Sequence, residues 1–492
     1  MNSLFKLFVR CLVRNKAYSV LNIAGLSVGI GISLLIFLMI RYELSVDGFH
    51  RNRDRIYRVV STETYRNGLV DYAGNAPIPL GDVLRQEFPQ PEKVAPVWRM
   101  DERQFILADD RNKFFKTGDI YFAGPELFDI FDFPWIAGDP HTGLQEPNTM
   151  ALTRSMADAW FGHWQNAMGR TVLMGEHLDP YKVTGVLEDM PGNTDFTMKV
   201  VLSYATFRIM EHDQMTDPRA WDNFSDNTQC FFLLGKGQQI SSMDAMLPAF
   251  VARHYTPLFA NSDTRDSSYF QPFKEMHFNT RFGRFGRDGW SYKQLWAIGL
   301  IGMFILAMAC INFINLSTAQ SLNRGKEVGV RKVLGSNPRQ LFMGFLAETG
   351  LLVVLALVLG VALAWLSLPA LIQILQKPLP VHSLFSGATA LFLLACGILV
   401  TFVAGAYPGL VLSRFEPIAA IKSKLNVRSV GGLSLRRGLI VLQFVVAQLL
   451  IIGTLVVVRQ MDFFRTLPMG FDRKAIALVR LPGVKNAADG SC

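Results

Sequence analysis

The sequence predicts a multi-pass α-helical membrane protein with a large mixed α/β extracytoplasmic domain between the first and second spans. Of its 492 residues, 50% are hydrophobic and only 18% are charged, which is too apolar for an ordinary soluble protein. Five long segments contain no Lys, Arg, Asp or Glu, and about 20 apolar residues suffice for a helix to cross a bilayer. A polar stretch, 41–293, separates the first two of these segments.

Residues 1–17 precede the first span and are predicted to form an amphipathic cytoplasmic helix. Lys6, Arg10 and Arg14 recur every four residues, with Leu and Phe between them. A helix with one basic and one apolar face lies in the membrane interface. Membrane lipid is therefore an expected partner of this segment.

The five predicted spans are 18–40, 295–319, 349–371, 387–412 and 438–458. A soluble helix of this length would have to be apolar on every side, so we favour membrane spans over buried core helices. A cleaved signal peptide is an alternative for the first span, because basic residues precede it. Its apolar stretch exceeds the roughly 7 to 15 residues of a signal peptide and no A-x-A-like site follows, so we interpret it as a retained anchor.

Basic residues predict how the chain is oriented. The segments 1–17, 318–344 and 413–437 are rich in Lys and Arg, whereas the loop 372–386 holds only Lys377. Because basic loops stay in the cytoplasm, the pattern predicts a multi-pass membrane protein with a cytoplasmic N-terminus. The last 34 residues, 459–492, fit less well, since they are placed outside and carry six basic and three acidic residues.

The segment 41–293 is expected to fold as the extracytoplasmic domain. Within it, 54–64 and 181–187 are predicted strands, and 77–88 and 155–161 are predicted short helices. It holds 27 Lys+Arg and 34 Asp+Glu, although the whole chain has a formal net charge of +9. The positive charge therefore flanks the spans, where anionic lipid accounts for it. Nucleic acid is not an expected partner.

The exits of the first and fifth spans resemble each other. G-F-H-R at 48–51 matches G-F-D-R at 470–473, and a strand-like segment follows both at the same offset. We interpret this as a duplicated module. On this interpretation 413–437 is a cytoplasmic linker, 438–458 begins a second module, and 459–492 begins a second periplasmic domain that is truncated. The C-terminus is then either a vestige of that module or, as we favour, the point where a fragment of a longer protein ends.

Motifs for several kinds of chemistry are absent from the sequence. It contains no phosphate-binding G-x-x-x-x-G-K-[ST] loop, no H-E-x-x-H and no G-x-S-x-G elbow, which argues against a nucleotide hydrolase, a zinc peptidase and a serine hydrolase. The five cysteines are scattered and form no zinc or disulfide framework. Adjacent acids such as Asp109 and Asp110 are weak catalytic candidates.

Small and polar residues inside the spans indicate helix packing. Gly25, Gly29 and Gly31 in the first span have spacings that allow close approach of another helix. Asn312 and Asn315 in the second span are expected to form interhelical hydrogen bonds, which we favour over a substrate path.

The segment 320–345, between the second and third spans, is the most informative. As a helix it would place Arg324, Glu327 and Arg331 on one face, with the last two in the favourable i, i+4 order. The other face would be apolar and consist of Val330, Val333 and Leu334. Pro338 is expected to break the helix before the third span. Such a helix could dock on the membrane or on a cytoplasmic partner, and these physical arguments favour neither.

Residues 324–335, R-G-K-E-V-G-V-R-K-V-L-G, followed by Q-L-F-M-G-F-L-A-E, resemble the cytoplasmic coupling segment of the MacB/FtsX-like family of ABC transporter permeases. The segments 118–139, 151–162 and 183–191 are similar to the periplasmic domain of that family. The segment 407–417 is similar to the end of its fourth span. With the repeat, the chain resembles the two-module version of these permeases, truncated at the C-terminus.

The resemblance implies the permease subunit of an ABC-type efflux or export system of the mechanotransmission kind. Such a chain is not an enzyme and binds no cofactor itself, because ATP is bound and hydrolysed by a separate cytoplasmic ATPase dimer, whose motion the permease relays to the periplasmic domain. Other implied partners are a second permease copy or second module and, for export, a periplasmic adaptor and an outer-membrane channel. The residues implied to couple to the ATPase are Arg324, Lys326, Glu327, Gly329, Arg331, Lys332 and Gly335, the two glycines by allowing close approach.

Two other functions compete with export. A non-transporting regulator of a cell-wall hydrolase or sensor kinase would use the same relay. A membrane-anchored enzyme with its active site in 41–293 is weaker, because that segment shows no paired acids, nucleophile or metal constellation.

Overall fold

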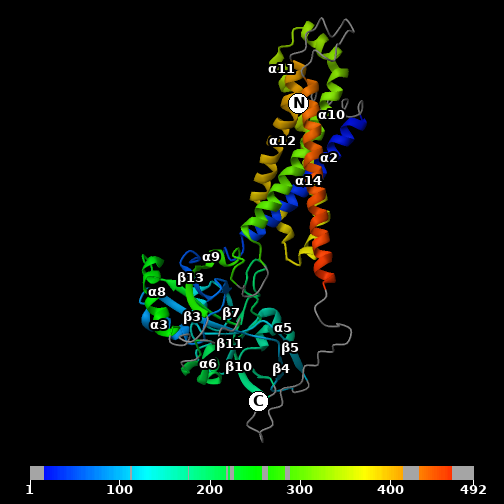
Figure 1. The fold of residues 1–492 in the computed structure, drawn as a ribbon. Coiled ribbons are helices and arrows are strands. Elements are labelled where there is room, and N and C mark those ends of the chain that lie inside the picture. Colours follow the sequence, from blue (N-terminus) through cyan, green and yellow to red (C-terminus); the bar gives the residue numbers. More distant parts are fainter. Residues whose placement is uncertain are drawn as a thin grey trace. The chain divides into compact units, whose positions relative to one another are not determined.

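The computed structural model describes residues 16–110, 113–175, 177–217, 220–221, 227–256, 264–282, 289–413 and 432–467. The chain divides into two units (Figure 1): a helical unit of residues 1–42 and 293–478, and an exposed domain of residues 43–292 and 479–492. Most of the predicted N-terminal amphipathic helix and of the predicted second periplasmic domain lies outside the described residues. So do the second G-F-x-R motif and most of the predicted linker 413–437.

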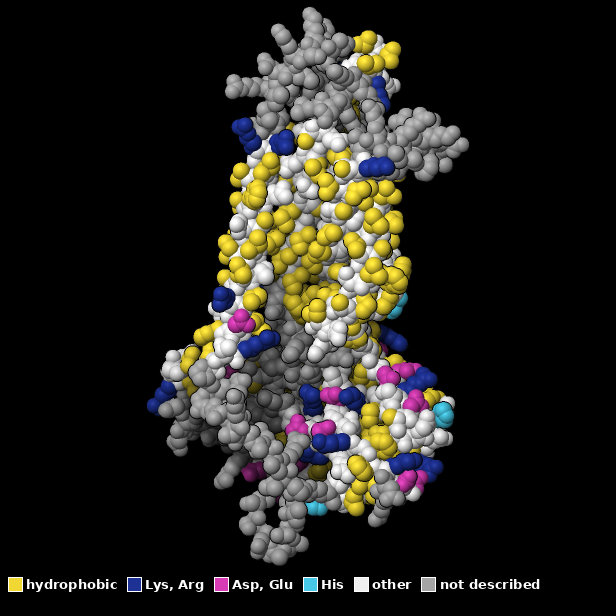
Figure 2. All heavy atoms as spheres, turned by 90° about the vertical axis from the view of Figure 1, so that its right-hand side faces the viewer, with side chains coloured by type: hydrophobic (Ala, Val, Ile, Leu, Met, Phe, Trp, Pro, Cys, Tyr) yellow, Lys and Arg dark blue, Asp and Glu magenta, His cyan; other side chains and the backbone are white. Residues whose placement is uncertain are grey.

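Five long helices form the part of the helical unit that the structure describes. They are α2 (Lys16–Leu44), α10 (Tyr292–Val333), α11 (Pro338–Leu375), α12 (Gly387–Ser413) and α14 (Gly432–Thr466), with a short helix η3 (Val381–Phe385) before α12. Each of the five contains a stretch long and apolar enough to cross a membrane, and each predicted span falls within one of them. Hydrophobic side chains cover the face of this unit that Figure 2 shows. The multi-pass architecture is thus confirmed.

Four of these helices share one apolar core. Leu26 of α2, Phe313 of α10, Leu352 of α11 and Val400 of α12 belong to the same buried cluster. The apolar stretch of α14, by contrast, has none of its residues buried within the described part of the chain. α14 is therefore the span whose surface this chain itself covers least.

Glycines allow α2 to approach two neighbouring helices closely. A Cβ atom added at Gly29 would lie 2.8 Å from the Cβ of Ala309 in α10, and one added at Gly31 would lie 3.1 Å from the carbonyl oxygen of Gly360 in α11. Gly25 also faces α10. Membrane helices pack through small residues because apolar side chains gain little by leaving lipid. The predicted packing role of these glycines is confirmed.

In its described residues, the exposed domain is built on one mixed sheet of thirteen strands. They are β1 (Ile56–Tyr65), β2 (Val70–Ala73), β3 (Pro91–Met100), β4 (Arg103–Leu107), β5 (Phe114–Thr117), β6 (Ile120–Ala123), β7 (Trp135–Ala137), β8 (Thr149–Thr153), β9 (Thr171–Met174), β10 (Asp179–Leu187), β11 (Val200–Ser203), β12 (Thr228–Leu234) and β13 (Thr264–Pro272). The main path runs β13-β1-β12-β3-β6-β11-β8-β10-β9-β4-β5, with β2 paired to β1 and β7 to β10. Strands β8 and β10 pair in parallel, as do β6 and β11.

Short helices accompany this sheet. They are α3 (Leu80–Glu87), α4 (Glu126–Ile130), α5 (Arg154–Phe161), η1 (Trp164–Asn166), α6 (Tyr204–Met210), α7 (His212–Thr216), α8 (Ile240–His254) and α9 (Phe273–Met276). The predicted strands 54–64 and 181–187 correspond to β1 and β10, and the predicted helices to α3 and α5. Helix α3 begins later than predicted because Pro79 disfavours helical geometry at the residue before it.

The central strand β12 shows how the sheet is buried on both faces. Phe232 and Leu234 join an apolar cluster with residues of α3 and α8, whereas Phe231 and Leu233 join a second cluster with residues of α4 and α9. Successive side chains of a strand point to opposite faces. All seven residues of β12 are buried for this reason.

Candidate functional site

The second span and the predicted coupling segment form one helix. α10 runs without interruption for 42 residues, from Tyr292 to Val333, and is therefore about 63 Å long at 1.5 Å per residue. Its apolar part covers only 292–320, so the helix continues beyond the span by about 20 Å. The first part of the predicted coupling segment, up to Val333, is thus a direct extension of the span.

A tight turn ends α10. The amide of Ser336 donates a hydrogen bond to the carbonyl of Arg331 at 3.0 Å, and the amide of Gly335 donates one to the carbonyl of Lys332 at 3.0 Å. This pair of bonds is the Schellman motif, which needs a residue in the left-handed conformation. Gly335 provides it, with a φ of +94°. The last glycine of the coupling motif therefore fixes the end of the helix.

Helix α11 begins directly after this turn. Asn337 caps it, and the Gln340 side chain accepts a hydrogen bond from the Asn337 amide at 3.1 Å to complete a capping box. Pro338 occupies the first helical position, where its missing N–H has no helical partner to lose. Pro338 does separate two helices as predicted, although α10 already ends at Val333.

The α10–α11 turn exposes apolar side chains beside cations. Leu334 is 81% exposed and Val333 67% exposed, and Arg331 next to them is exposed as well. From α11, Met343 adds another exposed apolar side chain. Exposed large apolar groups gathered in one place mark interaction surfaces. We call Arg331, Val333 and Leu334 the tip.

The predicted coupling residues are placed as follows. Gly329 is buried, Lys332 is half-buried, and Arg331 and Gly335 are exposed. The backbone of 321–327 is helical, but the side chains of Arg324, Lys326 and Glu327 lie outside the part of the chain that the structure describes. The predicted pairing of Glu327 with Arg331 stays a prediction.

A second group of residues lies within the exposed domain and includes Glu43, which closely follows the first predicted span. The sequence did not reveal this group. Glu43, in the last turn of α2, is fully buried and its Oε2 lies 2.8 Å from His277 Nε2. His277 Nδ1 lies 2.8 Å from Asp195 Oδ1. A Cβ added at Gly289, just before α10, would lie 2.5 Å from the His277 carbonyl oxygen. His277 thus lies between the end of α2 and the start of α10.

The neighbouring Asp47 holds the loop after β10. Its carboxylate accepts hydrogen bonds from the Thr194 hydroxyl and, at 3.2 Å, from the Asp195 amide. Its own amide donates to the Asn193 carbonyl at 2.9 Å. The loop 193–195 is therefore fastened to the chain immediately after α2. We call Glu43, Asp47, Asp195 and His277 the joint.

Burial and mutual charge set the protonation of the joint. Burial and, less strongly, the nearby charge of Asp195 raise the pKa of Asp47 to about 7. Burial alone would lower the pKa of His277, but hydrogen bonds to Asp195 and Glu43 outweigh it and raise the pKa to about 9. Burial lowers the pKa of the adjacent His50 to about 4. At neutral pH His277 is therefore a buried cation between two carboxyl groups, while His50 is neutral.

The signals for the joint were present in the sequence but dispersed. Glu43 follows the first span by three residues, and Asp195 belongs to a Pro-Gly-Asn-Thr-Asp stretch that indicates a turn. Glu43 and His277 are 234 positions apart. Only the fold brings them together.

Two family models match the chain. The model of the MacB-like periplasmic core domain matches residues 19–247, and the model of the FtsX-like permease C-terminal domain matches residues 299–417. Together they cover more than two thirds of the chain. The α10–α11 turn lies within the second match, and Glu43, Asp47 and Asp195 lie within the first.

A curated relative and two solved structures are also similar. The macrolide export ATP-binding/permease protein MacB of Bdellovibrio bacteriovorus is 27% identical over 122 residues, which is 25% of this chain and only 18% of the length of that relative. A domain of a permease protein from Porphyromonas gingivalis is 19% identical, with 51% of this chain and 98% of that domain covered and a TM-score of 0.39. The periplasmic region of MacB from Actinobacillus actinomycetemcomitans is 16% identical, with 44% and 88% covered and a TM-score of 0.29.

Proposed function

The chain belongs to the MacB/FtsX-like family of ABC transporter permeases, and from this premise we propose that it relays ATP-driven motion of a separate ATPase to its exposed domain for export. The observation that carries the proposal is the continuity of α10. This helix connects the end of the exposed domain at Tyr292 with the tip, without a break at the end of the span. A displacement imposed at the tip is transmitted along it.

The tip offers a surface that an ATPase can bind. Leu334 and Val333 are among the most exposed apolar side chains of the chain, and Arg331 adds a cation beside them. A helix end of this kind fits a groove that is apolar at its centre and acidic at its rim. The fixed geometry of the Gly335 turn would keep the tip rigid when the ATPase pushes on it.

The joint offers the other end of the relay. His277 contacts Glu43 at the end of α2 and approaches Gly289 just before α10. Movement of α10 relative to α2 therefore acts on the joint and, through Asp195, on the loop after β10. The motion would reach the sheet by this path.

The proposal includes further partners. The unburied apolar stretch of α14 would pack against a second permease copy or a second module. The ATPase would form a dimer in the cytoplasm, which places the tip and the N-terminus on the cytoplasmic side of the inner membrane. Export across an outer membrane would in addition need a periplasmic adaptor and an outer-membrane channel.

The proposal is tested by ATPase stimulation. The full chain in nanodiscs is combined with each ABC ATPase of the source organism that lacks membrane spans of its own. Arg331→Glu and Leu334→Asp should each abolish binding and stimulation of the ATPase that the wild type stimulates. Arg459→Glu reverses another exposed arginine, on α14, and should leave stimulation intact. Unchanged stimulation in both tip variants would exclude the tip as the coupling surface.

A further inference from the structure

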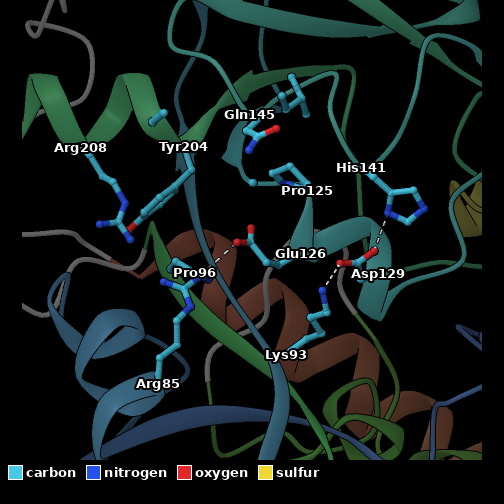
Figure 3. Close-up of a pocket in the computed structure, with 13 residues that line it drawn as sticks. Arg85, Lys93, Pro96, Pro125, Glu126, Asp129, His141, Gln145, Tyr204 and Arg208 are labelled. Atoms are coloured by element: carbon cyan, nitrogen blue, oxygen red, sulfur yellow. Dashed lines mark ion pairs between the residues drawn. The ribbon is translucent and has the colours of Figure 1, made fainter.

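A cavity of about 530 Å³ opens in the exposed domain (Figure 3). Its lining comes from α3, β3, α4, α6 and the loop after β7. Pockets that hold small ligands have volumes of about 300 to 1,000 Å³. Neither the relay nor the tip uses any residue of this pocket.

One end of the pocket presents hydrogen-bond donors. Arg85 Nη1 lies 2.7 Å from Asp82 Oδ1, and the Arg208 guanidinium contacts the same carboxylate oxygen. Two guanidinium groups thus share one carboxylate. Each guanidinium carries five N–H donors, so this end keeps donors to offer a second anion.

Tyr204 lies at the same end. Its ring is 5.7 Å from the Arg208 guanidinium carbon, and its side chain lines the pocket. The residue is only 5% exposed, and its hydroxyl has no hydrogen-bond partner in the described part of the chain. Burial raises the pKa of Tyr204, so the hydroxyl stays protonated. A buried hydroxyl without a partner costs free energy, which a ligand that accepts its hydrogen bond would recover.

A carboxylate lies between this end and the opposite one. Glu126 is placed in the middle of the pocket in Figure 3, and its ion pair with Arg85 is long, at 4.0 Å. At the far end Asp129 already holds Lys93 and His141, each at 2.8 Å. Glu126 is therefore the acid in this pocket with the weakest pairing.

The charges in and behind the pocket balance. Arg85, Lys93 and Arg208 are matched by Asp82, Glu126 and Asp129. A dianion such as phosphate would face Glu126 without enough free positive charge. A ligand with one anionic and one cationic group would satisfy both ends.

We propose that this pocket binds a short zwitterionic peptide, with its carboxylate at Tyr204, Arg85 and Arg208 and its ammonium group at Glu126. The volume has room for more than one amino-acid residue. The carboxylate accepts from the Tyr204 hydroxyl and from guanidinium N–H groups, which are strong charge-assisted bonds. The proposal concerns binding to the exposed domain and does not require that the chain exports anything.

Binding of three tripeptide probes to the full chain in nanodiscs tests the proposal. Trialanine should bind, whereas trialanine amide and N-acetyl-trialanine, which each lack one terminal charge, should bind at least about tenfold more weakly. Tyr204→Phe should weaken trialanine about tenfold while leaving the affinity for the amide unchanged. Glu126→Gln should weaken trialanine but not the acetylated probe.

A matched control and three contrary outcomes complete the test. Glu102→Gln removes another carboxylate of the same domain, one that pairs with Lys116, and should not change any affinity. Equal binding of the three probes, no binding of trialanine up to millimolar concentration, or Tyr204-dependent binding of inorganic phosphate would each overturn the proposal. ATPase stimulation is measured separately, so failure here is distinguishable from failure of the relay.

Discussion

His277 Nε2 lies 2.8 Å from Glu43 Oε2, and both side chains are almost completely withdrawn from solvent. The contact ties the last turn of α2 to the segment that leads into α10. Buried ion pairs add little net stability compared with apolar packing. We infer that this pair instead fixes the position of Glu43 relative to His277 within the exposed domain.

Glu43→Gln should destabilise the exposed domain. The substitution keeps the size of the side chain but leaves His277 with one carboxylate fewer, and loss of a partner from a buried pair costs about 3 kcal/mol. Denaturant unfolding of the full chain at pH 7, monitored by tryptophan fluorescence, measures this loss in the free energy of unfolding. Glu92→Gln removes a half-exposed partner of Arg55 and should cost less than about 1 kcal/mol. Equal losses in the two variants would argue against a special role of the pair.

Stability should fall as the pH rises from about 6.5 to 9. The pKa of His277 is raised from 6.5 to about 9, so the folded state holds a proton that the unfolded state has lost in this window. The contribution of His277 to the free energy of unfolding is complete below pH 6.5 and vanishes above pH 9. It amounts to about 3 kcal/mol. Unfolding free energies at several pH values, in wild type and His277→Gln, measure it.

The His277→Gln variant separates the pH effect of His277 from those of Asp47 and His50. The raised pKa of Asp47, about 7, makes the free energy of unfolding fall as the pH rises from about 4 to 7. The lowered pKa of His50, about 4, makes the free energy of unfolding rise as the pH rises from about 4 to 6.5. Neither accounts for a loss above pH 7. The same slope above pH 7 in His277→Gln and wild type would refute the assignment.

The spans were predictable because hydropathy reports directly on lipid exposure. The end of α10 could not be predicted from hydropathy, because hydropathy falls after residue 320 while the backbone stays helical until the Gly335 turn. Gly325 and Gly329 also lower the helix propensity of this stretch. The joint could not be predicted because Glu43, Asp195 and His277 come from three distant segments. The sheet order depends on such long-range pairings as well.

Gly335→Ala should distort the α10–α11 turn. No atom of the described residues lies within 4 Å of a Cβ added at Gly335, so the cost is conformational and comes from the φ of +94° at this glycine. An L-residue there costs about 1 to 2 kcal/mol. Gly344→Ala places the same methyl in open space within helix α11 and should instead stabilise by up to about 1 kcal/mol. Spin-label distances between α10 and α11 should change in the first variant only, and unchanged distances in both would show that the turn tolerates alanine.

Gly29→Ala should force α2 away from α10. The new methyl group would lie 2.8 Å from the Cβ of Ala309, closer than van der Waals contact permits, and overpacking of this kind costs about 1 to 3 kcal/mol. Ala309→Gly removes the opposing atom, so the double variant should recover most of the loss. Gly453→Ala adds a methyl on α14 with nothing within 4 Å and should be close to neutral. Thermal unfolding of the four variants in nanodiscs gives the coupling energy of the pair. Additive effects at Gly29 and Ala309 would mean that the two helices do not meet at these residues.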